Sequence, residues 1–329
     1  MRSNKYPGLI RSAKVAVAGM AVVLLGDCAG PERKVTDRNV RVGPSRKAVE
    51  KVDVVPAPAG VAPALDRPFD LDAPAAAGST QREDGHGILS IGGELEHDGH
   101  HLALQLTSEA VFSGTTQVLE VVGGRATKLR TTYDKLEVTM QVRATMDGQE
   151  QVNRMPSQTL PLQGETVLSE LRGDFYHRRL ESGAPTAEQA EMLKEPRPVI
   201  TQYAGRPVSV GATWDVSTDA LEAMAGGLLD KVTGPATGRL VTVSPCGEHT
   251  CAQVSFAGDV RGELPIGLIP DGLHWRMEGK CQRDVTRNLD LACHSSGPLS
   301  GRLQLGPGAE IEATGSLQFD WRERAVETP

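Results

Sequence analysis

The chain has 329 residues and a formal net charge of −7 at pH 7, so it lacks the basic excess that nucleic-acid-binding domains carry. Aromatic residues make up only 4% of the sequence, which gives no sign of a stacking platform for bases or sugars. Composition and charge therefore predict no nucleic-acid partner, and the oligomeric state is left open.

The N-terminal stretch has the layout of an export signal. Four Lys and Arg residues lie within the first fourteen positions, and an apolar run follows at residues 15–26. This run is shorter than the roughly 20 apolar residues that a membrane-spanning helix requires. We therefore predict that residues 1–27 are a signal peptide and that the mature chain is exported.

The end of this segment, Leu25-Gly26-Asp27-Cys28, resembles the lipobox of bacterial lipoproteins. Three of the four positions fit, and Asp27 departs from the pattern. The resemblance implies that Cys28 becomes the acylated first residue and anchors the chain in the cell envelope, at the outer membrane or its periplasmic face. The alternative is a small-x-small cleavage after Ala29, which would release a soluble secreted protein.

Residues 28–82 are predicted to form a disordered tether. The first part is charged with a basic excess, and the second part is rich in proline and alanine. Neither part has enough large apolar residues to bury a core. We expect the lipid anchor at one end of this tether and a globular domain, residues 83–329, at the other.

In the remaining chain apolar and polar residues alternate, which is typical of antiparallel strands with one dry face. The alternation is clearest in three runs: residues 101–108, 135–142 and 316–321. Dipeptides that favour hairpin turns separate such runs: Asp98-Gly99, Gly123-Gly124 and Asp147-Gly148. The predicted fold class is mainly β (β-rich α+β), with a curved antiparallel meander sheet or a two-layer sheet. A subdivision near residues 196–206 is the alternative to one domain.

Two short helices are predicted to interrupt the strands. The first has Thr186 as its N-cap, carries Gln189 at the capping-box spacing, and ends before Pro196. The second begins with a cap at Thr218 or Asp219.

The second helix, together with a later loop, is a candidate lid over an apolar ligand. Its residues Leu221, Met224 and Leu228 are spaced along one helical face. The loop lies between Pro265 and Pro270 and carries three further apolar residues: Ile266, Leu268 and Ile269. The alternative is that all six side chains fill the core.

The four later cysteines form an even set in a chain predicted to be exported, so disulfides are expected. Cys246 and Cys251 flank a predicted four-residue turn. A three-residue turn at 286–288 would place Cys281 opposite Cys293, and Asn288 suits its left-handed position. This register would also pair Arg283 with Leu291 and Val285 with Leu289. The alternatives are free thiols, or a zinc site in which His249 and His294 join the cysteines.

One hairpin carries a candidate metal site. If Asp98-Gly99 is a two-residue turn, His97 lies opposite His100, and two opposed imidazoles can reach one transition metal. A catalytic zinc needs a third protein ligand, which His86, Glu83 or Asp84 would have to supply. The simpler interpretation is a solvated hairpin tip without metal.

Sequence motifs give no support for catalysis or for a cofactor. The chain has no G-x-S-x-G nucleophile elbow and no phosphate-binding glycine motif. We therefore expect a non-catalytic envelope protein that binds an apolar or lipidic ligand, or another envelope component, on the inner face of a sheet. The alternatives are a structural or assembly lipoprotein without a small ligand and, ranked last, a metal-dependent hydrolase.

Overall fold

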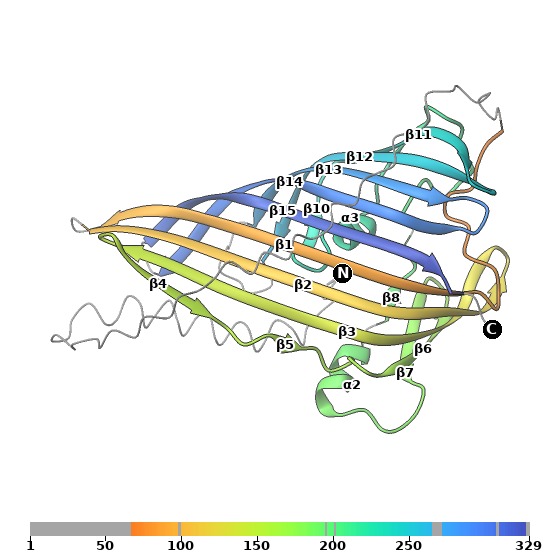
Figure 1. Cartoon of the computed structure of the whole chain (residues 1–329), viewed down its shortest axis with the longest axis horizontal. Coiled ribbons are helices and arrows are strands. Elements are labelled where there is room, and N and C mark those ends of the chain that lie inside the picture. The colour runs from red at the N-terminus through yellow and green to blue at the C-terminus, as the bar shows by residue number, and fades with distance from the viewer. Residues whose placement is uncertain are drawn as a thin grey trace.

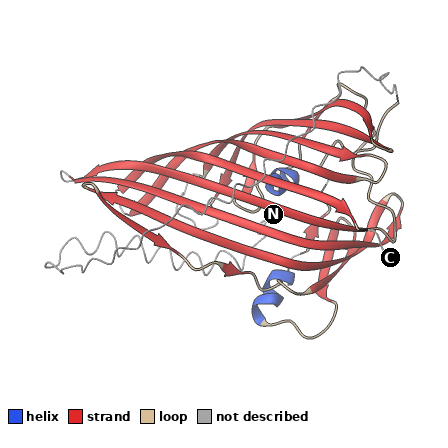
Figure 2. Cartoon of the chain, viewed as in Figure 1, coloured by secondary structure: helices blue, strands red, loops and turns tan. Residues whose placement is uncertain are grey.

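The computed structural model describes residues 67–97, 100–194, 196–200, 202–264, 272–306 and 309–326. Strands dominate the described chain, with two short helices (Figure 2). The predicted signal peptide, Cys28 and the tether up to residue 66 lie outside the described residues. So do the Asp98-Gly99 turn and the predicted lid residues Ile266, Leu268 and Ile269.

All strands among the described residues belong to one antiparallel sheet, which confirms the predicted mainly β class and selects a single sheet over two layers. The fifteen strands are β1 (Thr80–His97), β2 (His100–Val122), β3 (Arg125–Met146), β4 (Gln149–Arg154), β5 (Gln158–Thr159), β6 (Thr166–Arg172), β7 (Phe175–Leu180), β8 (Arg197–Pro198), β9 (Thr213–Asp215), β10 (Asp230–Thr233), β11 (Ala236–Cys246), β12 (His249–Glu263), β13 (Leu273–Asp284), β14 (Leu289–Gly306) and β15 (Ala309–Ala325).

Their order is mostly that of a meander, because neighbours in sequence pair in space. The sheet runs β8-β7-β6-β3-β2-β1-β15-β14-β13-β12-β11-β9; β4 and β5 also pair with β3, and β10 pairs with β12. The β1–β15 pair joins the first and the last described strands in sequence, and residues on both sides of 196–206 contribute to the same sheet. The long central strands curve together, so the sheet has an inner and an outer face (Figure 1).

The packed part of the chain begins before residue 83, the start predicted from composition. Phe69 and Leu71 are buried in the main core, and Phe69 forms a β-bridge with Val208. Composition placed the end of the tether too late because residues 67–82 contain few large apolar side chains, but those few are buried.

The described turns follow the sequence signals. Both Gly123 and Gly124 have positive φ (57° and 74°), as do Asp147 (49°) and Gly148 (83°). Two consecutive residues with positive φ match the right-handed twist of the flanking strands. The predicted β2–β3 and β3–β4 hairpins are therefore confirmed.

The first predicted helix is confirmed as α2 (Ala187–Lys194). The Thr186 N–H donates to the side-chain oxygen of Gln189 (2.9 Å), and the Gln189 N–H donates to the Thr186 hydroxyl (3.2 Å). These reciprocal bonds form the capping box. Pro196 follows the helix, as predicted.

The second helix, α3 (Thr218–Met224), differs from the prediction at both ends. Its N-cap is Ser217 rather than Thr218 or Asp219, because the Ser217 hydroxyl accepts from the Ala220 N–H (3.2 Å). The helix ends before Leu228, because Gly226 and Gly227 adopt positive φ (61° and 74°).

Both predicted disulfides are present: Cys246–Cys251 and Cys281–Cys293. Two disulfides indicate an oxidising, exported environment. The first turn is shorter than predicted, because β11 and β12 pair up to Cys246 and His249.

The register of the second cysteine hairpin is only partly as predicted. Cys281 lies opposite Cys293, but a bulge after Gln282 pairs Arg283 with Asp290 instead of Leu291. A four-residue turn then replaces the predicted three-residue turn, so Val285 does not pair with Leu289. Asn288 has the expected left-handed φ of 59°.

Candidate ligand cavity

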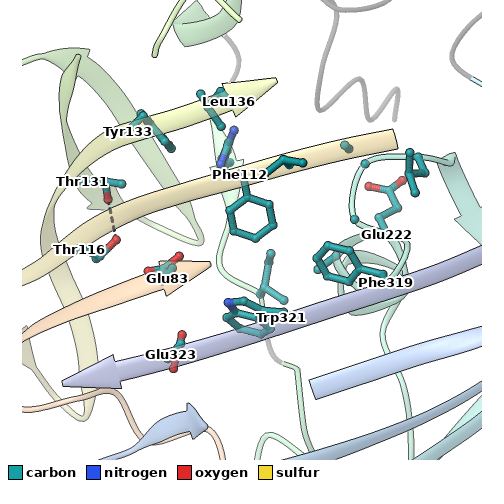
Figure 3. A pocket seen from close by; sticks show the side chains of 18 of the residues that line it. Glu83, Phe112, Thr116, Thr131, Tyr133, Leu136, Glu222, Phe319, Trp321 and Glu323 are labelled. Carbon is teal, nitrogen blue, oxygen red and sulfur yellow. Dashed lines mark hydrogen bonds between the residues drawn. The ribbon is translucent and has the colours of Figure 1, made fainter. Parts of the chain in front are cut away.

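A cavity of about 620 Å³ lies against the inner face of the sheet. The sheet contributes residues of β1, β2, β3, β6, β7 and β15. Other parts of the wall come from Leu71–Ala75, from residues 155–162 and from residues 222–230, which include the end of α3. Further lining residues lie at 192–203, 264 and 283–290. Figure 3 shows part of this lining from close by.

Most of the lining is apolar. Inward-facing positions of β1, β2 and β3 contribute Leu89, Leu106 and Met140, and Met155 adds a second flexible thioether. Methionine adapts its shape to a ligand more readily than branched side chains do. The strand geometry therefore produces an apolar compartment along the sheet.

Glycines on β1 leave room for large neighbours on this inner face. A Cβ atom at Gly85 would lie 1.9 Å from the Phe112 ring, and one at Gly87 would lie 2.8 Å from Leu228. The Phe112 ring in turn stacks on Phe319 of β15, with centroids 6.0 Å apart. These contacts set an aromatic surface on the cavity wall, which Figure 3 shows together with Trp321.

A polar band crosses the same face beside the aromatic surface. It consists of Gln81 and Glu83 on β1, Thr116 on β2, Thr131 on β3 and Glu323 on β15, all lining the cavity. The two threonine hydroxyls are hydrogen-bonded to each other (3.1 Å). Leu89 lies six residues from Glu83 along β1, about 20 Å at the usual strand rise. The cavity therefore combines an apolar compartment with a separate polar band.

Glu83 and Glu323 are direct partners in the β1–β15 register. Burial raises the pKa of Glu83, although hydrogen bonds from Thr116 and Gln81 partly oppose the shift. Burial also raises the pKa of Glu323 well above its ordinary value, and the negative charges of Asp290 and Glu83 add to this shift. Two acidic groups that resist ionisation thus lie side by side in the cavity wall.

A buried network adjoins Glu323. The Glu323 carboxylate oxygen Oε2 accepts from the Asp290 N–H (2.7 Å). Asp290 Oδ1 in turn accepts from the Tyr203 hydroxyl (2.5 Å) and from Arg283 Nη1 (3.0 Å). Burial alone would lower the pKa of Arg283, but the charge of Asp290 reverses this and raises it. Arg283 is therefore held as a cation by its partner.

Asp72 and Ala73, which precede β1 in the sequence, are hydrogen-bonded to residues in and near this network. The Asp72 carboxylate accepts from the backbone N–H groups of Tyr203 (2.9 Å) and Gly205 (2.7 Å). Arg283 Nη2 donates to the carbonyl of Ala73 (2.8 Å). The last part of the predicted tether, residues 71–75, therefore forms a wall of the cavity.

The predicted lid residues have different positions. Leu228 lines the cavity beside Leu229 and Leu264, whereas Leu221 and Met224 of α3 are buried in the core and do not line it. All three described residues belong to the core, and only Leu228 among them also lines the cavity.

The three residues named as possible third metal ligands, His86, Glu83 and Asp84, lie far along β1 from the His97–His100 pair. His97 and His100 are register partners, as predicted, but His86 lies eleven residues away along β1, about 35 Å at the usual strand rise. His86 Nε2 is hydrogen-bonded to Glu109 (2.8 Å). Within the described residues, no cluster of three His, Cys, Asp or Glu side chains has metal-binding geometry.

The alternative zinc site beside the cysteines is wrong, because all four sulfurs are in disulfides and none is a thiolate ligand. His294 Nδ1 is hydrogen-bonded to Asp320 (2.8 Å) and its Nε2 to Ser296 (3.1 Å).

Sequence reasoning missed the polar band and the Arg283 network. Glu83 appeared only as a spare metal ligand, and Glu323 not at all. The sequence did contain a signal, because side chains alternate between the two faces of a strand. Phe319, Trp321 and Glu323 share one face of β15, so an acidic residue continues an otherwise apolar series.

No protein family matches the chain, and no curated protein matches it. A solved structure described as lipid–protein interactions in lipovitellin is similar over 78% of this chain, with 11% identity and a TM-score of 0.34; the match covers 26% of that chain. OccK5 (OpdH) of Pseudomonas aeruginosa is similar over 75% of this chain and 98% of its own, with 8% identity and a TM-score of 0.14. TM-scores this low support no argument about function.

Proposed function

We propose that this chain is a non-catalytic lipoprotein of the bacterial cell envelope that binds an apolar or lipidic ligand against the inner face of its sheet. The observation that supports the proposal is the cavity of about 620 Å³, whose lining is mostly apolar. Cavities that hold one small ligand usually measure about 300–1,000 Å³ and combine apolar walls with a few polar groups. The cavity has both properties.

The expected gain from filling this cavity is large enough for specific binding. Burying one methylene group contributes about 0.8 kcal/mol, so about ten methylenes would contribute about 8 kcal/mol. That energy corresponds to a dissociation constant of about 1 μM. It is an upper bound, because association also costs translational and conformational freedom.

The proposed location is the cell envelope, with Cys28 as the anchor. The lipobox resemblance at residues 25–28 and the pairing of the other four cysteines support this assignment. Among the described residues, no helix combines the length and the apolar character needed to span a bilayer. We propose that the anchor holds the domain near the membrane from which a lipidic ligand would come.

Native mass spectrometry of protein purified without detergent tests the binding function. We expect bound species of lipid mass on the wild-type chain. Ala110 lines the cavity in the middle of β2, so Ala110→Trp should fill the space and remove the bound species. Ala257 is exposed on β12, so Ala257→Trp should leave them in place.

A wild-type protein without bound lipid that also fails to take up added lipid would contradict the proposal. That result would favour a structural or assembly role without a small ligand. Circular dichroism of the Ala110→Trp variant separates loss of binding from loss of the fold.

A further inference from the structure

The polar band contains two opposed carboxyl groups, and nothing so far assigns them a role. Glu83 and Glu323 come from the first and the last described strands in sequence, and the β1–β15 register places them side by side on the cavity wall (Figure 3). Glu323 is buried, with a relative exposure of 8%. Placing the half-buried Glu83 beside this buried acid is costly, so a purely structural wall would be more stable with apolar residues here.

The charged residues of the whole lining are mostly acidic. Among the described residues, the lining contains no lysine or histidine, and its acidic residues outnumber its arginines by seven to three. The acidic residues are Asp72, Glu83, Glu137, Glu222, Asp230, Asp290 and Glu323, and the arginines are Arg178, Arg197 and Arg283. The lining therefore favours a neutral or positively charged ligand and repels an anion.

The arginines of the lining already have partners within the protein. Arg283 donates to Asp290 and to the Ala73 carbonyl, and Arg178 Nη2 donates to the Met192 carbonyl. The charge of Arg197 acts on Glu83 and lowers its pKa, against the larger effect of burial. An anionic head group beside these three arginines would face the two glutamates and the five other acidic residues of the lining.

We infer that the polar band binds the head group of an acyl amphiphile that donates hydrogen bonds and carries no negative charge, with an ammonium group as the best fit. This inference rests on the proposed function. The carboxylates of Glu83 and Glu323 are acceptors, and an ammonium head supplies three donors in a compact group. The acyl chain would extend from the band toward Leu89, Leu106 and Met140.

The location of the two acids explains why an ammonium group is preferred over a hydroxyl. Burial raises the pKa of both glutamates because the cavity solvates a carboxylate poorly. A bound cation supplies the missing counter-charge, so it stabilises the ionised acids, whereas a hydroxyl offers only a hydrogen bond. Preference for the amine should therefore increase with pH as the two acids ionise.

Three probes of equal chain length test the inference: dodecylamine, dodecanol and dodecanoate. Each probe is titrated into the purified protein at concentrations at which the probe does not form micelles. Hydrogen bonds to charged groups contribute enough to expect that dodecylamine binds about 10–100-fold more tightly than dodecanoate, with dodecanol between them. The Glu83→Gln/Glu323→Gln variant keeps the shape of both side chains and should lose about tenfold in affinity for the amine. Its affinity for dodecanol should change less than about threefold.

The matched control uses the same two strands. Glu94 on β1 and Glu312 on β15 are exposed and do not line the cavity, so Glu94→Gln/Glu312→Gln should leave the ranking unchanged. The same loss in this control would show that general surface charge attracts the amine, and would overturn the inference.

The outcomes of this experiment distinguish the head-group preference from the proposed lipid-binding function. Equal or tighter binding of dodecanoate by the wild-type protein would overturn the head-group assignment and leave lipid binding intact. Failure of all three probes to bind would instead contradict the proposed function. The wild-type ranking requires no variant, so it stays informative if a substitution impairs folding.

Discussion

Glu83 on β1 faces Glu323 on β15, and these neighbouring strands are the first and the last of the described strands in sequence. Both side chains line the cavity, beside an aromatic surface that includes Phe112 and Trp321 (Figure 3). Like charges opposed on neighbouring strands destabilise a sheet. Protonation of these two carboxyl groups and binding of a ligand beside them should therefore affect each other.

The stability of the fold should depend on the protonation of Glu323. Its pKa is higher in the folded protein than its ordinary value of 4.5, mainly because of burial. The folded state thus holds this proton more tightly than the unfolded chain does. The stability that the raised pKa of Glu323 contributes is fully present below about pH 4.5 and is lost as pH rises through the raised pKa. The free energy of unfolding in urea should be lower at about pH 8 than at about pH 5.

Glu323→Gln should reduce this decline, because glutamine cannot ionise. Its amide oxygen can still accept from the Asp290 N–H, as Glu323 does in the folded protein. Identical pH profiles for the wild type and the variant would show that Glu323 does not ionise in this range. The exposed-site variant Glu312→Gln is the control.

The two disulfides should contribute unequally to stability. They close loops with sequence separations of 5 and 12 residues. Loop entropy predicts about 2 kcal/mol for Cys246–Cys251 and about 3 kcal/mol for Cys281–Cys293. Unfolding of the two double Cys→Ala variants measures each value. Detection of four alkylatable thiols in the native, unreduced protein would contradict both pairings.

The Asp72 carboxylate should hold residues 67–75 against the rest of the protein. Asp72→Ala removes the acceptor for the backbone N–H groups of Tyr203 and Gly205, so it should cost about 1.5–3 kcal/mol of stability. Hydrogen exchange should also become faster in residues 67–75. The neighbouring Asp70 is exposed, and Asp70→Ala should cost less than about 0.5 kcal/mol. Equal effects of the two variants would show that the carboxylate does not hold this segment.

Processing at the lipobox-like segment has a distinct mass signature. Protein extracted from membranes should begin at Cys28 and carry an addition of diacylglycerol size. Cys28→Ser should abolish the addition and the membrane association. An unmodified chain beginning at Gly30 would show instead that cleavage follows Ala29.

Local patterns predicted much of the fold. Period-two alternation located β2, β3 and β15, and the cysteine spacing predicted both disulfides. The Thr186–Gln189 capping box marked the start of α2. Each of these features depends on residues that are close in sequence.

The errors came from interactions that local patterns do not contain. Buried Asp284 accepts from the N–H groups of Thr286 and Arg287, which favours the four-residue turn over the predicted three-residue one. Hydrogen bonds from Arg287 also lower the pKa of Asp284, although its burial acts in the opposite direction. The Glu83–Glu323 pair needed the β1–β15 register, which connects residues from opposite ends of the described chain.

Photo-crosslinking tests most directly whether an amphiphile occupies the cavity. An amine with a photoactivatable alkyl chain, irradiated on the purified protein and mapped by peptide mass spectrometry, should label Leu106, Met140 and Met155. Ala110→Trp should reduce this labelling, whereas Ala257→Trp should not. Labelling confined to exposed apolar residues outside the cavity, such as Leu119, Val122 and Val241, would contradict the account.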